Sequence, residues 1–282
     1  MHIGIGLPIS DPPALLDWAR RADDGPFSTL GLLDRLVYDN PEPLVTLAAL
    51  AGATRRIRLQ TEVLLAPLRE TALLAKQAAT LDVLSGGRFT LGVGVGGRAD
   101  DHRAAGTDLH TRGRRLDEQI GLLRHLWSGE PFGPDCGPVG PAPRHPTGPE
   151  ILFGGFQPAA LDRVGRWGGG LLAAAAPSWA GDLFDIARRS WKDHGRTGEP
   201  RIVAQVNVAI GDADLVADAR ASMGAYYEFS GRAEYMLDRM LTTPADIRSA
   251  ITQFGDLGAD EVMLYCYGRD ADQVDRLADI IG

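Results

Sequence analysis

The chain alternates short apolar runs with longer amphipathic segments from its first residues to its last. The apolar runs are rich in aliphatic and β-branched residues, which is typical of strands that are covered on both faces. The eight strand-like runs are 3–7, 29–33, 57–65, 89–95, 150–153, 170–174, 202–209 and 261–265. Eight strands that are each followed by a helix predict an α/β fold, a (β/α)8 TIM barrel.

The helical segments between these runs show apolar residues at helical spacing. In 71–84, for example, Leu74, Ala78 and Leu81 share one face, and Gly86-Gly87 provides a C-terminal stop. The predicted helices are 13–23, 43–53, 71–84, 111–127, 159–167, 179–194, 215–229, 244–257 and 271–280.

A doubly wound sheet would show the same alternation of strands and helices. The even repeat and the uniformly apolar strands favour the barrel, and the 282 residues suffice for one. We therefore expect a single domain over 1–282, with an irregular, Pro- and Gly-rich surface loop at 129–149.

Charge and composition narrow the class of function. The formal charge of −8 argues against nucleic acid and against an acidic membrane surface as partners. No apolar run approaches the ~20 residues of a membrane span, and the N-terminus looks like a buried strand and not a signal peptide. Cys136 and Cys266 lack metal-ligand spacing. We expect a cytoplasmic protein with reduced cysteines.

The fourth strand-like run ends in a glycine-rich stretch, Gly92-Val93-Gly94-Val95-Gly96-Gly97, that satisfies the dinucleotide pattern GxGxxG. The polar residues 98–102 follow it in place of an apolar helix, and the acidic residue expected after the next strand is missing. Glycines on an inward-facing strand would instead clear space for a flat ring at the barrel centre. The alternative is tight packing of the barrel layers without a ligand.

Three consecutive blocks closely resemble the luciferase-like monooxygenase superfamily. They are LQTEVLLAPLR at 59–69, LAKQAATLDVLSGGR at 74–88 and LGVGVG at 91–96, and shorter matches are RGRRLDE at 112–118 and ILFGG at 151–155. The resemblance implies a barrel that binds FMN, or the 5-deazaflavin coenzyme F420, at the C-terminal ends of its strands. It also implies reduced FMN supplied by a separate flavin reductase, and a homodimer.

The resemblance places the flavin ring against a non-proline cis peptide in the third strand, here between Glu62 and Val63. The family usually has a small residue at the first position, so Glu62 is a departure that brings a carboxylate near the ring. This carboxylate would oppose negative charge on the reduced flavin. Gly94 and Gly96 are the expected cofactor-facing glycines of the next strand.

The resemblance also predicts a phosphate site at Gly154-Gly155, with Phe156 and Gln157 leading into the next helix. Backbone N–H groups at a helix start suit a phosphate, although an ordinary strand-to-helix turn would have the same sequence. Arg112 falls where some relatives place a phosphate-pairing arginine, and the alternative is a salt bridge between neighbouring helices.

The second strand departs from the family at its end, where Asp34-Arg35 replaces an acidic residue and a histidine. We take both as candidate catalytic residues. An arginine cannot shuttle protons, but it can hold an anionic substrate or balance charge on the reduced ring. Alternatively, Arg35 is locked in an ion pair with Asp34 or Glu42.

Four further residues follow strand ends and are candidates for a substrate pocket: Tyr38, His102, His110 and Trp179. Solvated histidines and ordinary core aromatics are the alternatives. The run 100–102 has metal-ligand residue types, but adjacent residues rarely converge on one ion, so we expect no metal.

These observations favour an FMN-dependent monooxygenase that uses reduced flavin and oxygen on a small organic substrate. The first alternative is an F420-dependent oxidoreductase. The second is a flavin-binding barrel without turnover, which the Asp34-Arg35 replacement would explain. The presence of Gly94, Gly96 and the Gly154-Gly155 turn favours an enzyme.

Overall fold

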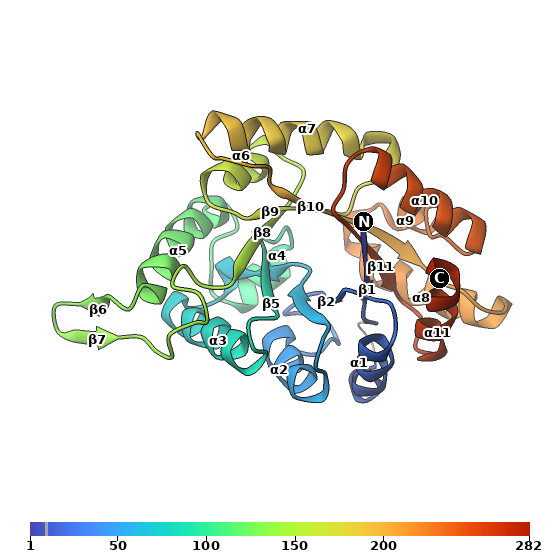
Figure 1. Cartoon of the computed structure of the whole chain (residues 1–282), viewed down its shortest axis with the longest axis horizontal. Helices are drawn as coiled ribbons and strands as arrows, with labels where there is room; N and C mark the ends of the chain where they lie inside the picture. The colour runs from blue at the N-terminus through green and yellow to red at the C-terminus, as the bar shows by residue number, and fades with distance from the viewer. Residues whose placement is uncertain (9–10) are drawn as a thin grey trace.

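Eight parallel strand positions close into a barrel in the computed structural model, which describes residues 1–8 and 11–282 (Figure 1). One position is shared by two short strands, β3 and β4, which both pair with β5, while β3 also pairs with β2. The barrel strands are β1 (His2–Gly6), β2 (Thr29–Leu32), β3 (Arg58–Thr61), β4 (Leu64–Leu65), β5 (Phe89–Gly94), β8 (Glu150–Gly154), β9 (Gly170–Ala173), β10 (Arg201–Val208) and β11 (Glu261–Cys266). The predicted TIM barrel is confirmed.

Helices surround the barrel, as Figure 1 shows. The predicted bounds 43–53 and 71–84 agree with the structure, and the other predicted helices begin or end within a few residues of the observed ones. The outer helices are α1 (Leu15–Asp24), α2 (Pro43–Ala53), α3 (Thr71–Leu84), α5 (Arg112–Trp127), α6 (Pro158–Arg166), α7 (Pro177–Asp193), α8 (Ala213–Tyr227), α10 (Pro244–Asp256) and α11 (Asp272–Ile281). Across residues 1–8 and 11–282, none of the helices is long and apolar enough to cross a membrane.

Several short elements were not predicted. A short polar helix, α4 (Ala99–Ala104), follows β5, where no apolar helix was expected. The loop 129–149 contains an antiparallel hairpin, β6 (Pro131–Gly133) and β7 (Cys136–Pro138), which projects away from the barrel in Figure 1. The other unpredicted elements are α9 (Ala233–Leu237) and the 3-10 turns η1 (Pro12–Ala14), η2 (Ala66–Leu68) and η3 (Glu228–Ser230).

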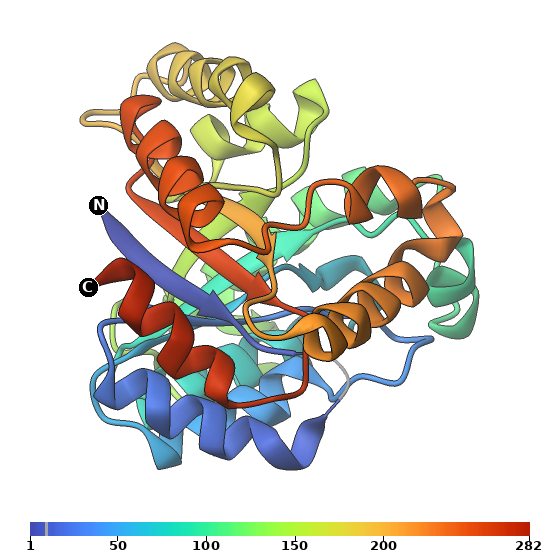
Figure 2. The same cartoon turned by 90° about the vertical axis from the view of Figure 1, so that its right-hand side faces the viewer.

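An ion-pair network closes the N-terminal end of the barrel. Arg201 at the start of β10 binds both Glu150 of β8 and Glu261 of β11. Arg58 of β3 also reaches Glu150, at 3.1 Å. These charged side chains are paired with one another. Active sites of such barrels lie at the opposite, C-terminal end of the strands. In Figure 2 the arrowheads of β1 and β11 point toward that end, where α8 and α9 lie.

Candidate functional site

The third barrel position is interrupted by a cis peptide between Glu62 and Val63, which confirms the predicted bond. The side chains of this bulge fill space that three glycines leave open. A Cβ atom would lie 2.4 Å from a Val63 methyl carbon at Gly94 and 2.6 Å from one at Gly154. At Gly31 it would lie 2.3 Å from Glu62 Cδ. Packing of the bulge therefore explains Gly94 and Gly154, and their contact with a ligand stays a prediction.

A pocket of about 150 Å³ opens at the C-terminal end of the barrel beside the bulge. Its lining comes from the end of β2, the β3–β4 bulge, the loop after β5, the end of α8 and η3. Its charged and aromatic lining residues include Asp34, Arg35, Glu62, Arg98, Tyr226 and Phe229. The structure thus brings together Arg35 and the cis peptide, which were predicted separately.

Arg35 forms a buried ion pair with Asp101 of α4, with 3.1 Å between Nε and Oδ2. The two side chains are 4% and 1% exposed. Asp101 also accepts hydrogen bonds from the backbone N–H groups of Leu36 and Val37, at 3.2 and 2.7 Å. The expected alternatives, pairing of Arg35 with Asp34 or Glu42, are wrong, because a residue 66 positions along the chain supplies the carboxylate.

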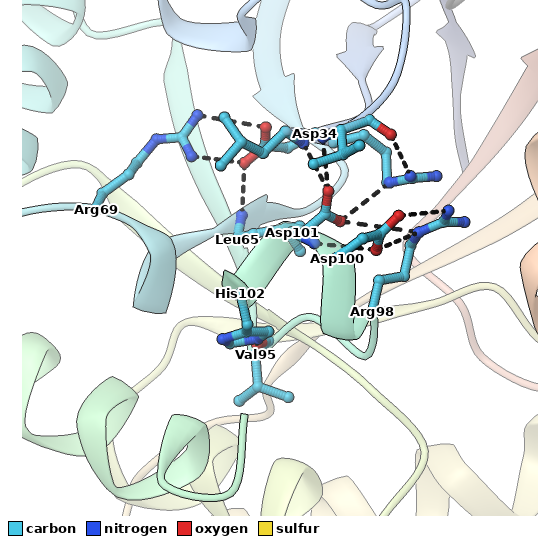
Figure 3. A network of polar contacts seen from close by, with 11 residues as sticks. Asp34, Leu65, Arg69, Val95, Arg98, Asp100, Asp101 and His102 are labelled. Carbon is cyan, nitrogen blue, oxygen red and sulfur yellow. Dashed lines mark hydrogen bonds and ion pairs between the residues drawn. The ribbon is translucent and has the colours of Figure 1, made fainter. Parts of the chain in front are cut away.

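Asp34 instead binds Arg69 and the start of β4, as Figure 3 shows. Its Oδ2 accepts from Leu65 N at 2.8 Å and from Arg69 Nη1 at 2.9 Å, and its Oδ1 lies 3.3 Å from Arg69 Nη2. Burial raises the pKa of Asp34, and the Arg69 charge opposes this shift. Both carboxylate oxygens are engaged, so Asp34 positions the strand after the bulge, and its catalytic role stays a prediction.

Aromatic rings surround the Arg35 guanidinium. Its Cζ lies 5.1 Å from the ring centroid of Tyr38 and 5.6 Å from those of Tyr226 and Phe229. Arg98 lies 3.8 Å from the Phe229 centroid. Tyr38 is therefore near the pocket, as predicted. No sequence signal pointed to Tyr226 and Phe229, because the segment around them resembles the family weakly.

The two predicted histidines lie elsewhere. The His102 ring is buried and engaged within its own loop, with 2.9 Å between Nδ1 and Thr107 Oγ1 and 3.3 Å between Nε2 and Val95 O. Gly96 has a φ of +69° and packs beside this ring. His110 is exposed. His102 thus stabilises its loop and His110 lies on the surface, in place of the predicted pocket positions.

A second pocket of about 280 Å³ lies at the ends of β9 and β10. Its lining is mainly apolar and includes Trp179, Val206, Met236 and Leu241, while Asn207 contributes a buried Oδ1 without a hydrogen-bond partner among the described residues. A mainly apolar pocket with a few polar groups is typical of small-molecule sites. Trp179 lines this pocket, and its predicted role in substrate binding stays a prediction.

The Gly154-Gly155 turn lies beside this second pocket, because the Phe156 ring contacts the Trp179 ring at 5.4 Å between centroids. Gly155 has a φ of +143°, and a Cβ atom there would lie 2.7 Å from Ala160 Cβ. Gln157 is the exposed N-cap of α6 and its side chain makes no cap hydrogen bond. In the first turn of α6, Pro158 has no N–H group and Ala160 N donates to Gln157 O at 2.8 Å, so Ala159 N–H is the helix donor left for an anion among the described residues, and the phosphate site stays a prediction.

Arg112 begins α5, which is joined to α6 by Arg163. Arg163 donates to Asp117 at 2.9 Å and to Gly113 O at 3.0 Å. Arg112 forms no salt bridge with any described residue, so the salt-bridge alternative is wrong, and its buried Nε has no partner in residues 1–8 and 11–282. Its predicted contact with a phosphate stays a prediction.

The polar atoms left unsatisfied around the pockets fit a flavin. Buried polar groups normally have hydrogen-bond partners. Within the described part of the chain, the exceptions near this end of the barrel include Arg35 Nη1, Glu62 Oε2 and Asn207 Oδ1. They supply a cation, a carboxyl group and an amide oxygen to a ligand. The described residues contain no cluster of three or more His, Cys, Asp or Glu side chains that could hold a metal ion.

Comparison with known proteins identifies the family. Residues 3–279 match the model of the luciferase-like monooxygenase family. The 4-hydroxyprotoasukamycin monooxygenase of Streptomyces nodosus subsp. asukaensis is 31% identical over 186 residues, which cover 59% of this chain and 50% of that protein. The matched part spans about half the length of the curated relatives.

Two solved structures share the fold at low sequence identity. An F420-dependent secondary alcohol dehydrogenase, in complex with an F420–acetone adduct, has a TM-score of 0.84 and 19% identity over 99% of this chain and 97% of its own. The oxygenating constituent of 3,6-diketocamphane monooxygenase from Pseudomonas putida, in complex with FMN, has a TM-score of 0.75 and 17% identity over 99% and 95%. With the family model covering nearly the whole chain and the cis peptide in place, the protein belongs to the luciferase-like monooxygenase family.

Proposed function

We propose that this protein is an FMN-dependent monooxygenase that uses reduced flavin and oxygen to oxidise a small, largely apolar organic substrate. The observation that carries the proposal is the pairing of two pockets at one end of the barrel, beside the Glu62–Val63 bulge and the Gly154-Gly155 turn. When bound, the flavin supplies the redox chemistry.

The residues of the chain would bind and orient the reactants. Glu62 and Val63 would contact the ring, Gly155 and the first turn of α6 would hold the phosphate, and Arg35 would balance negative charge. The apolar second pocket would hold the substrate and exclude water. The diketocamphane protein is the oxygenating constituent of its monooxygenase, which supports a separate flavin reductase as partner here as well.

An F420-dependent oxidoreductase is the second candidate function, because the structure with a TM-score of 0.84 is an F420-dependent alcohol dehydrogenase. Anaerobic titrations with reduced FMN and with reduced F420 separate the candidates. We expect tighter binding of reduced FMN. Tighter binding of F420 would indicate hydride transfer in place of oxygen chemistry. If neither cofactor binds, the protein has the barrel of the family without its flavin chemistry.

The phosphate turn can be tested without disturbing Gly155, whose φ of +143° tolerates only glycine. We expect Gln157→Glu to weaken reduced FMN binding about tenfold, because it sets a carboxylate beside the phosphate. The same charge suits the N-terminus of α6 and should add up to about 0.5 kcal/mol to stability.

Ala245→Glu is the matched control for Gln157→Glu, since it adds the same charge to the exposed first turn of α10. This control should bind flavin like the wild type. Unchanged flavin affinity in Gln157→Glu would remove the turn from the cofactor site.

We also propose a homodimer formed by α2 and α3. Both helices expose apolar side chains, with Val45 67%, Leu73 56% and Leu84 62% exposed, and a shallow groove of about 280 Å³ runs between them. An apolar patch of this kind is typical of a protein interface, and a symmetric pair of copies would bury it on both.

Leu73→Glu is expected to convert this dimer to monomers at micromolar concentration, as measured by sedimentation velocity. Leu16→Glu places the same charge at a 38%-exposed leucine of α1 and should leave the mass unchanged. A wild-type monomer, or a Leu73→Glu variant that remains a dimer, would contradict the proposed interface.

A cytoplasmic location is part of the proposal. Both cysteines are free, with Cys136 exposed and Cys266 buried. Burial raises the pKa of the Cys266 thiol, so this residue serves as a small apolar side chain. Free thiols agree with a reducing compartment.

A further inference from the structure

The two charged residues at the end of β2 are both held in ion pairs. Arg35 keeps its proton in proteins, and its Nε is committed to Asp101 at 3.1 Å. Asp34 is committed to Arg69 and Leu65. A flavin enzyme at this site must therefore find its acid elsewhere in the pocket.

Glu62 is a carboxyl group of the pocket lining with a free oxygen. Its side chain is 3% exposed and lies over Gly31, where any Cβ atom would collide with it. Oε1 accepts a hydrogen bond from Gln60 Nε2 at 2.9 Å, whereas Oε2 has no partner among residues 1–8 and 11–282. The fold thus makes space for this carboxyl group and leaves one of its oxygens unsatisfied beside the cis peptide.

The charged groups around Glu62 are paired with one another and not with it. Below it in the barrel, Arg201 of β10 binds Glu150 and Glu261. Across the pocket, Arg35 binds Asp101, at 3.1 Å.

The remaining groups near Glu62 do not neutralise it either. Arg69 binds Asp34, with 2.9 Å between Nη1 and Oδ2. Arg98, in the loop after β5, binds Asp100, with 3.1 Å between Nη2 and Oδ2. The Tyr265 phenol of β11 accepts a hydrogen bond from Leu33 N at 3.0 Å. No described cation forms an ion pair with the Glu62 carboxyl group.

Burial without a counter-ion raises the pKa of Glu62 to about 8, with Gln60 and Arg201 opposing the shift and Glu261 adding to it. The carboxyl group is therefore protonated at neutral pH. A protonated carboxyl group is a hydrogen-bond donor and a proton source, and an acid whose pKa lies near the working pH is the most effective one. The sequence predicted a charged carboxylate that would repel negative charge on the reduced flavin. Glu62 is instead a neutral carboxylic acid at neutral pH.

We propose that Glu62 is the general acid of this site and takes over the proton transfer that Arg35 cannot perform. The Oε2–H bond breaks, the proton moves to an oxygen or nitrogen anion of the molecule bound in the pocket, and the carboxylate regains a proton from water. The step needs no further reactant. It rests on the proposed function, since the acceptor is bound flavin or substrate.

The alternative is that Glu62 only fills space beside Gln60. Glu62→Gln separates the two roles, because glutamine keeps the shape and a hydrogen-bond donor but cannot release a proton. Glu70→Gln, at an exposed glutamate that precedes α3, is the matched control.

The first readout is the affinity for reduced FMN without oxygen, titrated at a series of pH values. We expect wild-type affinity to fall about tenfold per pH unit above pH 8, because a carboxylate then faces the negatively charged ring. Affinity of Glu62→Gln should not change over that range, and Glu70→Gln should follow the wild type.

The second readout is turnover, which should fall ~100-fold or more in Glu62→Gln at every pH while flavin affinity at pH 7 is kept. Wild-type turnover in the variant, or a wild-type affinity that does not depend on pH near 8, would overturn the assignment. If neither wild type nor variant binds reduced FMN or F420 at any pH, the proposed function fails instead.

Discussion

Replacing Asp101 by alanine is expected to lower the free energy of unfolding by about 3–5 kcal/mol. Asp101 is 1% exposed and accepts hydrogen bonds from Arg35 and from the backbone of Leu36 and Val37. Its loss would leave the Arg35 cation buried without a partner and two N–H groups unsatisfied. Urea unfolding of the wild type and of Asp101→Ala measures this difference.

The neighbouring residue provides the control. Asp100 is also an aspartate and pairs with Arg98 at 3.1 Å, but its side chain is 40% exposed. Because ion pairs in water contribute little, Asp100→Ala should cost less than about 1 kcal/mol. Equal effects of the two substitutions would show that the Arg35–Asp101 pair does not hold the pocket together.

Glu62→Gln is expected to stabilise the protein at neutral and alkaline pH. The pKa of Glu62 rises from 4.5 to about 8 in the folded state. Between these values the folded protein binds more protons than the unfolded one, so wild-type stability decreases as the pH rises. Glutamine does not titrate, and the variant should therefore gain on the order of 3 kcal/mol over the wild type at pH 7.

The pH dependence of this gain is its diagnostic feature. The difference in unfolding free energy between Glu62→Gln and the wild type should be close to zero near pH 4.5, grow toward pH 8 and then stay constant. Guanidinium unfolding at several pH values measures it without any cofactor. A difference that does not change with pH would mean that Glu62 is ionised throughout and would remove the basis of the acid proposal.

The barrel could be predicted from the sequence because each strand and helix has a local signal. The run 57–65 was predicted as one strand, and the structure divides it into β3 and β4 at the cis peptide. Family resemblance located that peptide, since no hydrophobic pattern marks it. Helix α4 escaped prediction because its six residues include Asp100, Asp101 and Arg103 and show no apolar stripe.

The site was only partly predictable, because its side chains meet through the closure of the barrel. Arg35 was singled out, but its partner Asp101 belongs to an element that was not predicted. The protonation of Glu62 depends on its burial in the closed barrel, with Arg201 paired to Glu261 opposing the shift, and no local pattern reveals either. The tyrosine and phenylalanine after β10, Tyr226 and Phe229, enter the pocket from a segment with little family resemblance.

The most direct test of the account is a crystal structure of the protein soaked with FMN. We predict the ring in the pocket against Val63 and near Glu62, with the phosphate at the Gly154-Gly155 turn. FMN bound at the opposite end of the barrel, for example in the cavity lined by Trp167 and Trp191, would contradict the assignment of the functional end.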